Sequence, residues 1–257
     1  TESQRPFECD GLAVYQQLPL ITVIPETVDH VQAILRLCHL YQVPLVPRGA
    51  GTGLCAGAMP HAQGVLLVMT KLNNILHINP NTATATVQPG VRNLALTEAV
   101  QDLGLYYAPD PSSQIACTIG GNVAENSGGV HCLKYGLTVN NVLQIKLITI
   151  DGQLMTLGGE GLDEPGMDLL SLFIGSEGLL GVVVEVKVKL LPKATRVQVL
   201  MAAYDSVTAA GDAVAALIGQ GIIPAGLEMM DHLAINAAEE FVKVGYPIEA
   251  QALLICE

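Results

Sequence analysis

PRGAGTGL, residues 47–54, is the stretch that decides the fold of this chain. Its glycines permit positive φ angles, and such a loop can turn several backbone N–H groups toward one anion. The spacing matches neither the Walker loop G-x-x-x-x-G-K-S/T nor the dinucleotide motif G-x-G-x-x-G. An ordinary glycine-rich turn between two strands explains the loop equally well when it is taken alone.

The chain around this loop alternates between strand and helix patterns. An apolar run at 20–24 predicts a strand, and Thr27 then N-caps a helix whose apolar residues recur at helical spacing. A brief strand at 45–46 leads directly into the glycine loop. The alternation continues with strands at 65–69 and 84–87 and a helix at 91–103, which Gly104 closes.

The second half begins with a loop-rich stretch, 109–136, and then changes to a strand pattern. Strands at 142–150 and 153–157 flank Asp151-Gly152, a dipeptide favoured in two-residue type I′ hairpins. Residues 182–190 alternate between apolar and polar, which predicts a strand with one core face and one wetter face.

Beyond Lys193 the pattern becomes strand, helix, strand, helix and strand, at 197–203, 207–218, 222–230, 233–242 and 252–256. We therefore predict an α+β fold with two domains, 1–194 and 195–257. The second domain stops within a strand, and about 60 residues rarely form a self-sufficient core, so we expect it to be truncated.

Composition excludes several classes of protein. Of the 257 residues 50% are apolar and 14% are charged, which indicates a folded chain. The formal net charge of −12 opposes binding to nucleic acid, because that affinity depends on Lys and Arg neutralising phosphates. The six cysteines include no C-x-x-C pair, which favours a reducing cytoplasm.

We expect neither a transmembrane segment nor a signal peptide, because no apolar run reaches roughly 20 residues and the N-terminus lacks the basic and apolar pattern. Attachment to the periphery of a membrane through partners stays open. The mean hydropathy of +0.44 is high for a solitary monomer and points to apolar surface that further chain or a partner covers.

Two more glycine-rich segments strengthen the case for a binding cleft. TIGGNVAENSGG, residues 118–129, has small residues and amides where a backbone must approach a ligand closely. GSEGLLGV, residues 175–182, leads directly into the long alternating strand, which fixes its backbone at a sheet edge. The rigid turn PDPSS, residues 109–113, is either a wall of this cleft or an ordinary surface turn.

Six motifs in this order resemble the PCMH-type FAD-binding domain of the vanillyl-alcohol oxidase superfamily. They are PRGAGTGL (47–54), QPG (88–90), DPSS (110–113), TIGGNVAENSGG (118–129), KYG (134–136) and GSEGLLG (175–181). The resemblance covers roughly residues 15–195 and is closest to FAD-linked subunits of glycolate oxidase and to D-lactate dehydrogenases. It implies a two-part FAD-binding domain followed by a truncated, ferredoxin-like α+β cap domain.

The resemblance also implies a cofactor, FAD. We expect noncovalent binding, because the first glycine loop lacks the histidine that tethers flavin in some members. The residues implied to bind FAD are Pro47, Arg48, Gly49, Ala50, Gly51, Thr52, Gly53, Leu54, Pro109, Asp110, Thr118, Gly120, Gly121, Asn122, Ala124, Gly128, Tyr135, Gly136, Glu177, Gly178, Gly181 and Val182. We assign no catalytic residue, because in the family these come largely from the later part of the cap domain.

Cys55 and Cys117 lie beside the glycine-rich segments. We interpret both as packing residues, because free cysteine most often behaves as a small buried hydrophobe. The six histidines show no metal-ligand spacing such as H-x-x-x-H, so no metal site is predicted.

The function that the resemblance implies is a FAD-dependent oxidation of a small 2-hydroxy acid, such as glycolate or D-lactate, to the 2-oxo acid by hydride transfer to flavin. Partner subunits or another electron acceptor would then reoxidise the flavin. Two alternatives stay open, a noncatalytic FAD-binding or assembly subunit and a flavin reductase of nucleotide sugars that uses NADPH. The fold does not separate them, because function resides in the substrate site.

Overall fold

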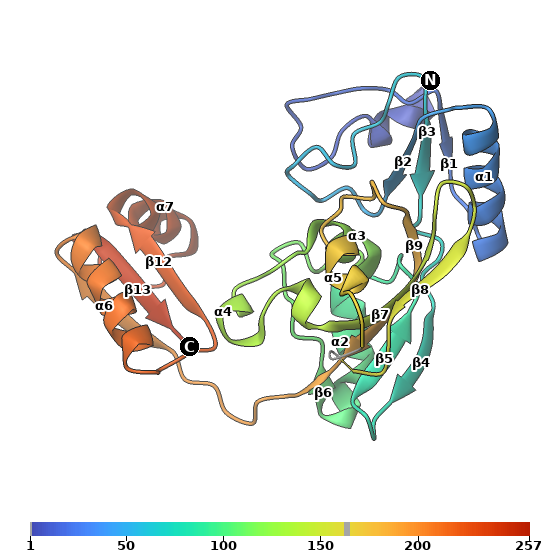
Figure 1. Cartoon of the computed structure of the whole chain (residues 1–257). Helices are drawn as coiled ribbons and strands as arrows, with labels where there is room; N and C mark the ends of the chain where they lie inside the picture. The colour runs from blue at the N-terminus through green and yellow to red at the C-terminus, as the bar shows by residue number, and fades with distance from the viewer. Residues whose placement is uncertain (1, 162–164) are drawn as a thin grey trace. The chain divides into compact units, whose positions relative to one another are not determined.

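The computed structural model describes residues 2–161 and 165–257, which form two compact units (Figure 1). The first unit comprises the chain up to Gly128 together with Leu137–Lys193. The second comprises Gly129–Gly136 and Ala194–Glu257. Its short segment 129–136 falls within the range that we assigned to the first domain from the sequence.

A small parallel sheet opens the first unit. Its strand order is β1 (Ile21–Val23), β3 (Val65–Val68) and β2 (Leu45–Arg48), and α1 (Val28–Leu40) connects β1 to β2. Thr27 caps α1 as predicted, because its hydroxyl oxygen accepts a hydrogen bond from the backbone N–H of His30 at 3.2 Å. The glycine loop therefore begins at the carboxyl end of a parallel strand, where ligands commonly bind in α/β sheets.

The larger part of this unit is a five-stranded antiparallel sheet. Its order is β4 (Ile75–Asn79), β5 (Thr84–Val87), β9 (Val182–Lys189), β7 (Val142–Ile148) and β8 (Leu154–Gly158). The accompanying helices are α2 (Asn93–Val100), α3 (Ile119–Glu125) and α5 (Leu169–Phe173), and β6 (Leu105–Tyr106) pairs with β10 (Leu191–Pro192). β9 lies in the middle of the sheet, which explains why its apolar residues are buried as the alternation predicts.

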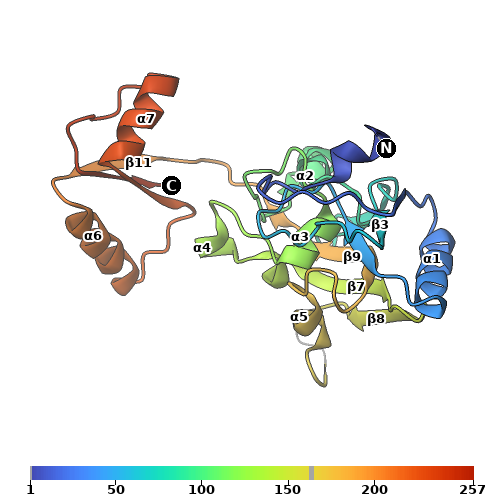
Figure 2. The same cartoon turned by 90° about the horizontal axis from the view of Figure 1, so that it is seen from above.

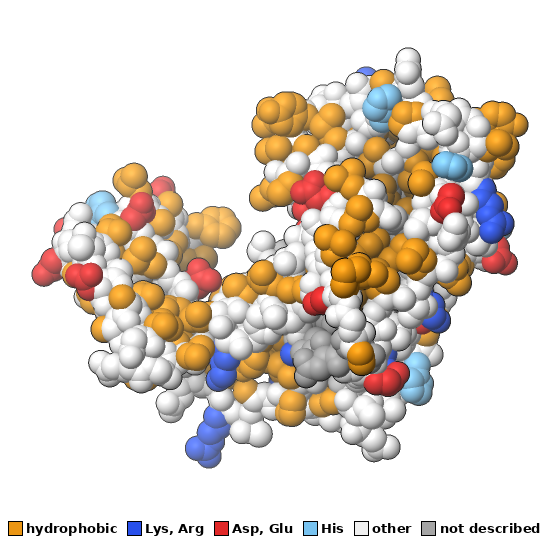
Figure 3. All heavy atoms as spheres, viewed as in Figure 1, with side chains coloured by type: hydrophobic (Ala, Val, Ile, Leu, Met, Phe, Trp, Pro, Cys, Tyr) orange, Lys and Arg blue, Asp and Glu red, His pale blue; other side chains and the backbone are white. Residues whose placement is uncertain are grey.

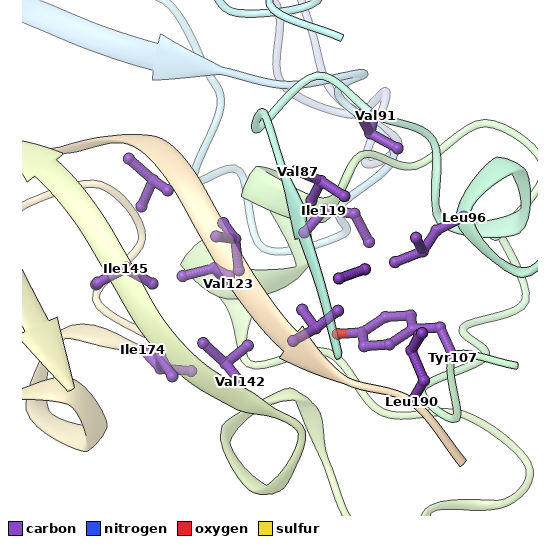
Figure 4. Packing of buried hydrophobic residues seen from close by; sticks show 14 of the residues in the cluster. Val87, Val91, Leu96, Tyr107, Ile119, Val123, Val142, Ile145, Ile174 and Leu190 are labelled. Carbon is purple, nitrogen blue, oxygen red and sulfur yellow. The ribbon is translucent and has the colours of Figure 1, made fainter. Parts of the chain in front are cut away.

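The core of the larger sheet holds α3 in place. Ile119 and Val123 of α3 are both 0% exposed and belong to the same apolar cluster as Ile145 of β7 (Figure 4). Full burial of such side chains contributes roughly 1.5–3 kcal/mol each. This packing outweighs the low helix propensity of Gly120 and Gly121 within the same helix.

A second apolar cluster joins the two sheets. It combines Val31 and Leu35 of α1 with Ile148 of β7 and with Val182 and Val184 of β9. α1 lies at the outer edge of the unit when it is seen from above (Figure 2). The cluster thus connects α1, which follows β1, to β9, which follows the segment GSEGLLG. Because the two sheets are held together in this way, loops from both can line one cavity.

The second unit has a three-stranded antiparallel sheet with two longer helices. The elements are α4 (Cys132–Tyr135), β11 (Leu200–Tyr204), α6 (Val207–Gly219), β12 (Leu227–Asp231), α7 (His232–Val242) and β13 (Ala252–Cys256), with strand order β11-β13-β12. The strand predicted at 222–230 forms only from Leu227, because Gly221 has a φ of +77° and Pro224 and Gly226 follow it. The α+β class predicted for the whole chain is confirmed.

The stretch 109–136, which we predicted to be loop-rich, contains two helices, α3 and α4. Thr118 is the N-cap that starts α3, because its hydroxyl oxygen accepts a hydrogen bond from the N–H of Gly121 at 3.2 Å. Strands β4 and β6 were also missed. Tertiary packing, more than local propensity, decides these elements.

The hairpin of β7 and β8 is confirmed, but the predicted two-residue type I′ turn is wrong. The last paired residues are Ile148 and Leu154, so that five residues connect the strands. Of the Asp151-Gly152 pair only Gly152 has a positive φ, +80°, whereas a type I′ turn needs two. The N–H of Gly152 donates to the carbonyl oxygen of Thr149 at 2.8 Å, and this bond closes the longer turn.

Apolar side chains gather on the surface over α5 (Figure 3). Leu172 of α5 and Leu179 beyond it are both exposed. Throughout 2–161 and 165–257, each helix is too short or too polar to cross a membrane.

Replacement of a core residue tests this packing. Ile145→Ala removes a side chain that is 0% exposed at the centre of the larger sheet. We expect the free energy of unfolding to fall by about 2–5 kcal/mol, measured by denaturant titration. Ile150→Ala, at a position 47% exposed in the turn after β7, is the matched control and should change little. Equal losses in both variants would contradict the assigned core.

Candidate functional site

A cavity of about 300 Å³ in the first unit collects the glycine-rich segments predicted from the sequence. This volume is at the lower end of the range for small-molecule sites. The glycine loop after β2, helix α3 and the loop before β9 each contribute to its wall. Three segments that are far apart in the sequence therefore meet around one space.

Close backbone approaches explain why glycine occurs in these segments. A Cβ at Gly49 would stand 2.3 Å from the Oγ1 atom of Thr118, and a Cβ at Gly120 would stand 2.5 Å from the Cβ atom of Pro89. Neither distance is sterically possible without movement of the neighbour. The backbone at both positions thus forms cavity wall without a side chain, and the N–H of Gly120 donates to the carbonyl oxygen of Pro89 at 2.8 Å.

The structure brings most of the predicted cofactor-binding residues to this cavity. Those that line it are Pro47, Arg48, Gly49, Ala50, Gly51, Thr52, Gly53, Leu54, Thr118, Gly120, Gly121, Asn122, Ala124, Glu177, Gly178, Gly181 and Val182. Pro109, Asp110 and Gly128 belong to the same unit but are not among the lining residues. Tyr135 and Gly136 belong to the second unit and stay predictions.

Several lining residues were missed from the sequence. They are Asp10, Gly57, Ala58, Met69, Pro89, Ser113, Cys117, Glu125, Ser127, Phe173 and Val183. Pro89, Ser113, Glu125 and Ser127 lie within quoted motifs and could have been included on that ground. Asp10 lies outside every motif, and only the fold brings it to the cavity.

Acidic groups form one wall of the site. The Sγ atom of Cys55 and carboxylate oxygens of Glu125 and Glu177 all lie within 4.8 Å of one another. Burial raises the pKa of Glu125, and the nearby carboxylates of Glu177 and Asp10 raise this pKa further. Asp10 is only 6% exposed, and its Oδ2 atom has no hydrogen-bond partner among the described residues.

The two cysteines beside the glycine segments differ. Cys117 is buried as predicted, and burial raises the pKa of its thiol, which keeps it protonated and unreactive. The interpretation of Cys55 as a buried packing residue is wrong, because Cys55 is exposed. Its position in a glycine-rich, polar loop leaves its side chain outside the two apolar clusters.

Comparison with known families supplies the deciding observation. Residues 19–158 match the model of the FAD binding domain, and residues 193–257 match that of the FAD linked oxidases, C-terminal domain. The chain belongs to the family of proteins that share this FAD binding domain. The predicted family and FAD as its cofactor are confirmed.

Several relatives of this chain are known. It is 61% identical over 252 residues to the glycolate oxidase subunit GlcD of Escherichia coli (strain K12), over 98% of this chain and 50% of the relative. It is 42% identical to GlcD of Bacillus subtilis (strain 168), over 98% of this chain and 54% of the relative. A D-lactate dehydrogenase of Anaerostipes hadrus is 33% identical over 97% of this chain and 53% of the relative.

The chain thus spans about half the length of the curated relatives it matches. A solved alkyldihydroxyacetonephosphate synthase shares the fold with a TM-score of 0.80 at 22% identity, over 94% of this chain and 48% of that one. At this identity the likeness shows the fold alone.

The cavity fits the chemistry of FAD. A Cβ at Gly49 would clash with Thr118, so the backbone of the glycine loop itself forms the cavity wall, where its N–H groups can bind a diphosphate. The free Oδ2 atom of buried Asp10 is an acceptor for a hydroxyl or amine of the nucleotide. Apolar side chains such as Met69, Phe173 and Val182 line the same cavity and suit aromatic rings.

The raised pKa of Glu125 predicts a pH-dependent stability. Between the ordinary and the raised pKa the folded chain binds more protons than the unfolded chain, so stability falls as pH rises through this window. Glu125→Gln should remove that part of the pH dependence and raise the melting temperature at pH 7 by about 1–2 °C. Thermal unfolding of the apoprotein from about pH 4 to 8 measures both effects.

Glu98→Gln is the control for this prediction, because Glu98 is exposed on α2 and lines no part of the cavity. An unchanged pH profile in Glu125→Gln, or an equal change in Glu98→Gln, would refute the assignment.

Proposed function

We propose that the chain binds FAD noncovalently in this cavity and forms the flavin-binding part of an enzyme that oxidises a 2-hydroxy acid such as glycolate or D-lactate. The observation that carries the proposal is the meeting of three glycine-rich segments around one cavity in the first unit. The named activities of the relatives support the substrate class.

The lining residues support noncovalent attachment. No histidine is among the residues that line the cavity in the described part of the chain, and the lining cysteine, Cys117, is a buried thiol with a raised pKa. The exposed thiol of Cys55 lies beside Glu125 and Glu177, but Cys55 is not among the lining residues. Acid precipitation of the reconstituted protein should therefore release the flavin into the supernatant, and flavin that stays with the pellet would refute this part.

Each segment has a distinct role in this proposal. The loop Gly49–Gly53 holds the diphosphate through backbone N–H groups, α3 and Gly178 close the cavity around the nucleotide, and apolar residues exclude water from the rings. FAD held in this cavity would supply the hydride-accepting chemistry that the oxidation of a 2-hydroxy acid needs. The substrate hydroxyl must lose its proton to a base at the same time, and none of the lining residues is assigned that role.

Substitution of Gly49 tests the cofactor site. In Gly49→Ala the new methyl would stand 2.3 Å from the Thr118 Oγ1 atom, so that either the loop or α3 must move. We expect FAD affinity to fall at least about tenfold, measured by flavin fluorescence titration. Gly211→Ala is the control, because a Cβ at Gly211 would have nothing within 4 Å. Wild-type affinity in Gly49→Ala would contradict the proposed location.

An anaerobic reduction experiment tests the substrate class. Glycolate or D-lactate added to the FAD-reconstituted protein should bleach the flavin absorbance, with L-lactate as the comparison. Bound flavin that stays oxidised with every hydroxy acid would favour a noncatalytic FAD-binding subunit instead. Bleaching by NADPH alone would favour a reductase.

We also propose that the chain acts with partner subunits in the cytoplasm, or at a membrane surface through them. The relatives with 61% and 42% identity are named as subunits, and exposed apolar side chains near α5 are consistent with a covered surface. A partner or a soluble acceptor would take electrons from reduced flavin. Monomeric behaviour in the presence of the native partners would refute the subunit role.

A further inference from the structure

A short N-terminal strap, residues 7–12, lies against the glycine loop within the first unit. A Cβ added to Gly11 would stand 2.8 Å from the carbonyl oxygens of both Thr52 and Gly53, so the two backbones are in direct contact. Asp10 of the strap is buried and lines the cavity. The strap therefore belongs to the wall of the site, although it contains no glycine-rich motif.

Arg48 connects this strap to the loop and to the segment beyond it. Its Nη1 atom donates to the carbonyl oxygen of Cys9 at 2.7 Å and to that of Ala58 at 3.4 Å. The guanidinium carbon lies 5.9 Å from the centre of the Phe7 ring, which is within range of a cation–π interaction. Hydrogen bonds from a charged donor are stronger than those between neutral groups.

The guanidinium also fills the inner side of the loop. A Cβ at Gly51 would stand 2.1 Å from the Nη2 atom of Arg48, and Gly51 has a φ of +74°. Arg48 is only 7% exposed, so little of it is available to a ligand. The loop is curved around this side chain, while its backbone forms part of the cavity wall.

We propose that Arg48 is a positioning residue, which ties the strap to the glycine loop and holds the loop in the shape that receives the diphosphate of FAD. The inference rests on the proposed function. The Nη1 atom of Arg48 donates to two carbonyl oxygens of the chain, and its Nη2 atom packs against Gly51. Arg48 therefore acts on the cofactor through the backbone of residues 49–53. A loop held in its bound shape before binding loses less entropy on binding, which raises affinity.

Two measurements on one set of variants test this role. FAD affinity is measured by fluorescence titration, and the alkylation rate of Cys9 in the apoprotein is measured by mass spectrometry of its peptide. Cys9 is half-buried in the strap, so its protection reports whether the strap is held. Arg48→Met should weaken FAD binding about tenfold or more and speed alkylation of Cys9 several-fold, as expected when the hydrogen bond from a charged donor to the carbonyl oxygen of Cys9 is lost.

The control is Arg36→Met, because Arg36 also donates to a backbone carbonyl, that of Gly152 at 3.3 Å, and lines no part of the cavity. It should change neither quantity. Phe7→Ala should cause smaller changes of the same sign. The double variant Phe7→Ala, Arg48→Met should be no worse than Arg48→Met alone, because both residues act through one contact.

Two results would overturn the proposal. The first is weaker FAD binding in Arg48→Met with Cys9 still protected, which would indicate direct contact with phosphate. The second is full FAD affinity in Arg48→Lys, together with effects of Phe7→Ala and Arg48→Met that add up in the double variant. This result would indicate that only the charge of Arg48 matters. Failure of the wild-type chain to bind FAD would instead refute the proposed function, while the protection of Cys9 would still report on the strap.

Discussion

The rest of this molecule depends on close contacts between backbone segments. These segments approach each other more closely than a Cβ atom would permit. Gly49 lies against Thr118, Gly120 against Pro89, and Gly178 against Pro47, and a side chain at any of these glycines would overlap its neighbour. The segments are loops next to strands of both sheets, together with the first turn of α3. The apolar cluster of α1, β7 and β9 joins those sheets, so that the contacts can form together and enclose one cavity.

The cavity combines N–H donors, which suit an anion, with carboxylates, which repel one. In the proposed function the glycine loop binds a diphosphate through its N–H groups, yet Glu125, Glu177 and Asp10 bring carboxylates to the same cavity, in a chain with a formal net charge of −12. The raised pKa of Glu125 lets this residue keep a proton at a higher pH than an exposed carboxyl group does. Each proton that Glu125 keeps would lower the repulsion that a diphosphate meets at this wall.

The N-terminal strap shows that the site extends beyond its motifs. A glycine loop has low intrinsic order, because each glycine loses more conformational entropy on folding than other residues do. Arg48 offsets this cost within the fold, since one buried guanidinium holds carbonyl groups on both sides of the loop. The same glycines that permit close approach therefore require a residue that restrains them.

The sequence by itself determined the α+β class, because apolar alternation is a local property of the chain. The family, FAD and most of the residues that line the cavity followed from the resemblance that six motifs carry in order. Only the tertiary structure decided the rest. Helix α3 forms through the burial of Ile119 and Val123 despite its glycines. A hydrogen bond from the N–H of Gly152 to the carbonyl oxygen of Thr149 sets the turn after β7. Cys55 is exposed, although its sequence context favoured a buried thiol. Asp10 and Arg48 acquire their roles from neighbours distant in sequence. Such contacts depend on how the two sheets pack, and no local pattern encodes that packing.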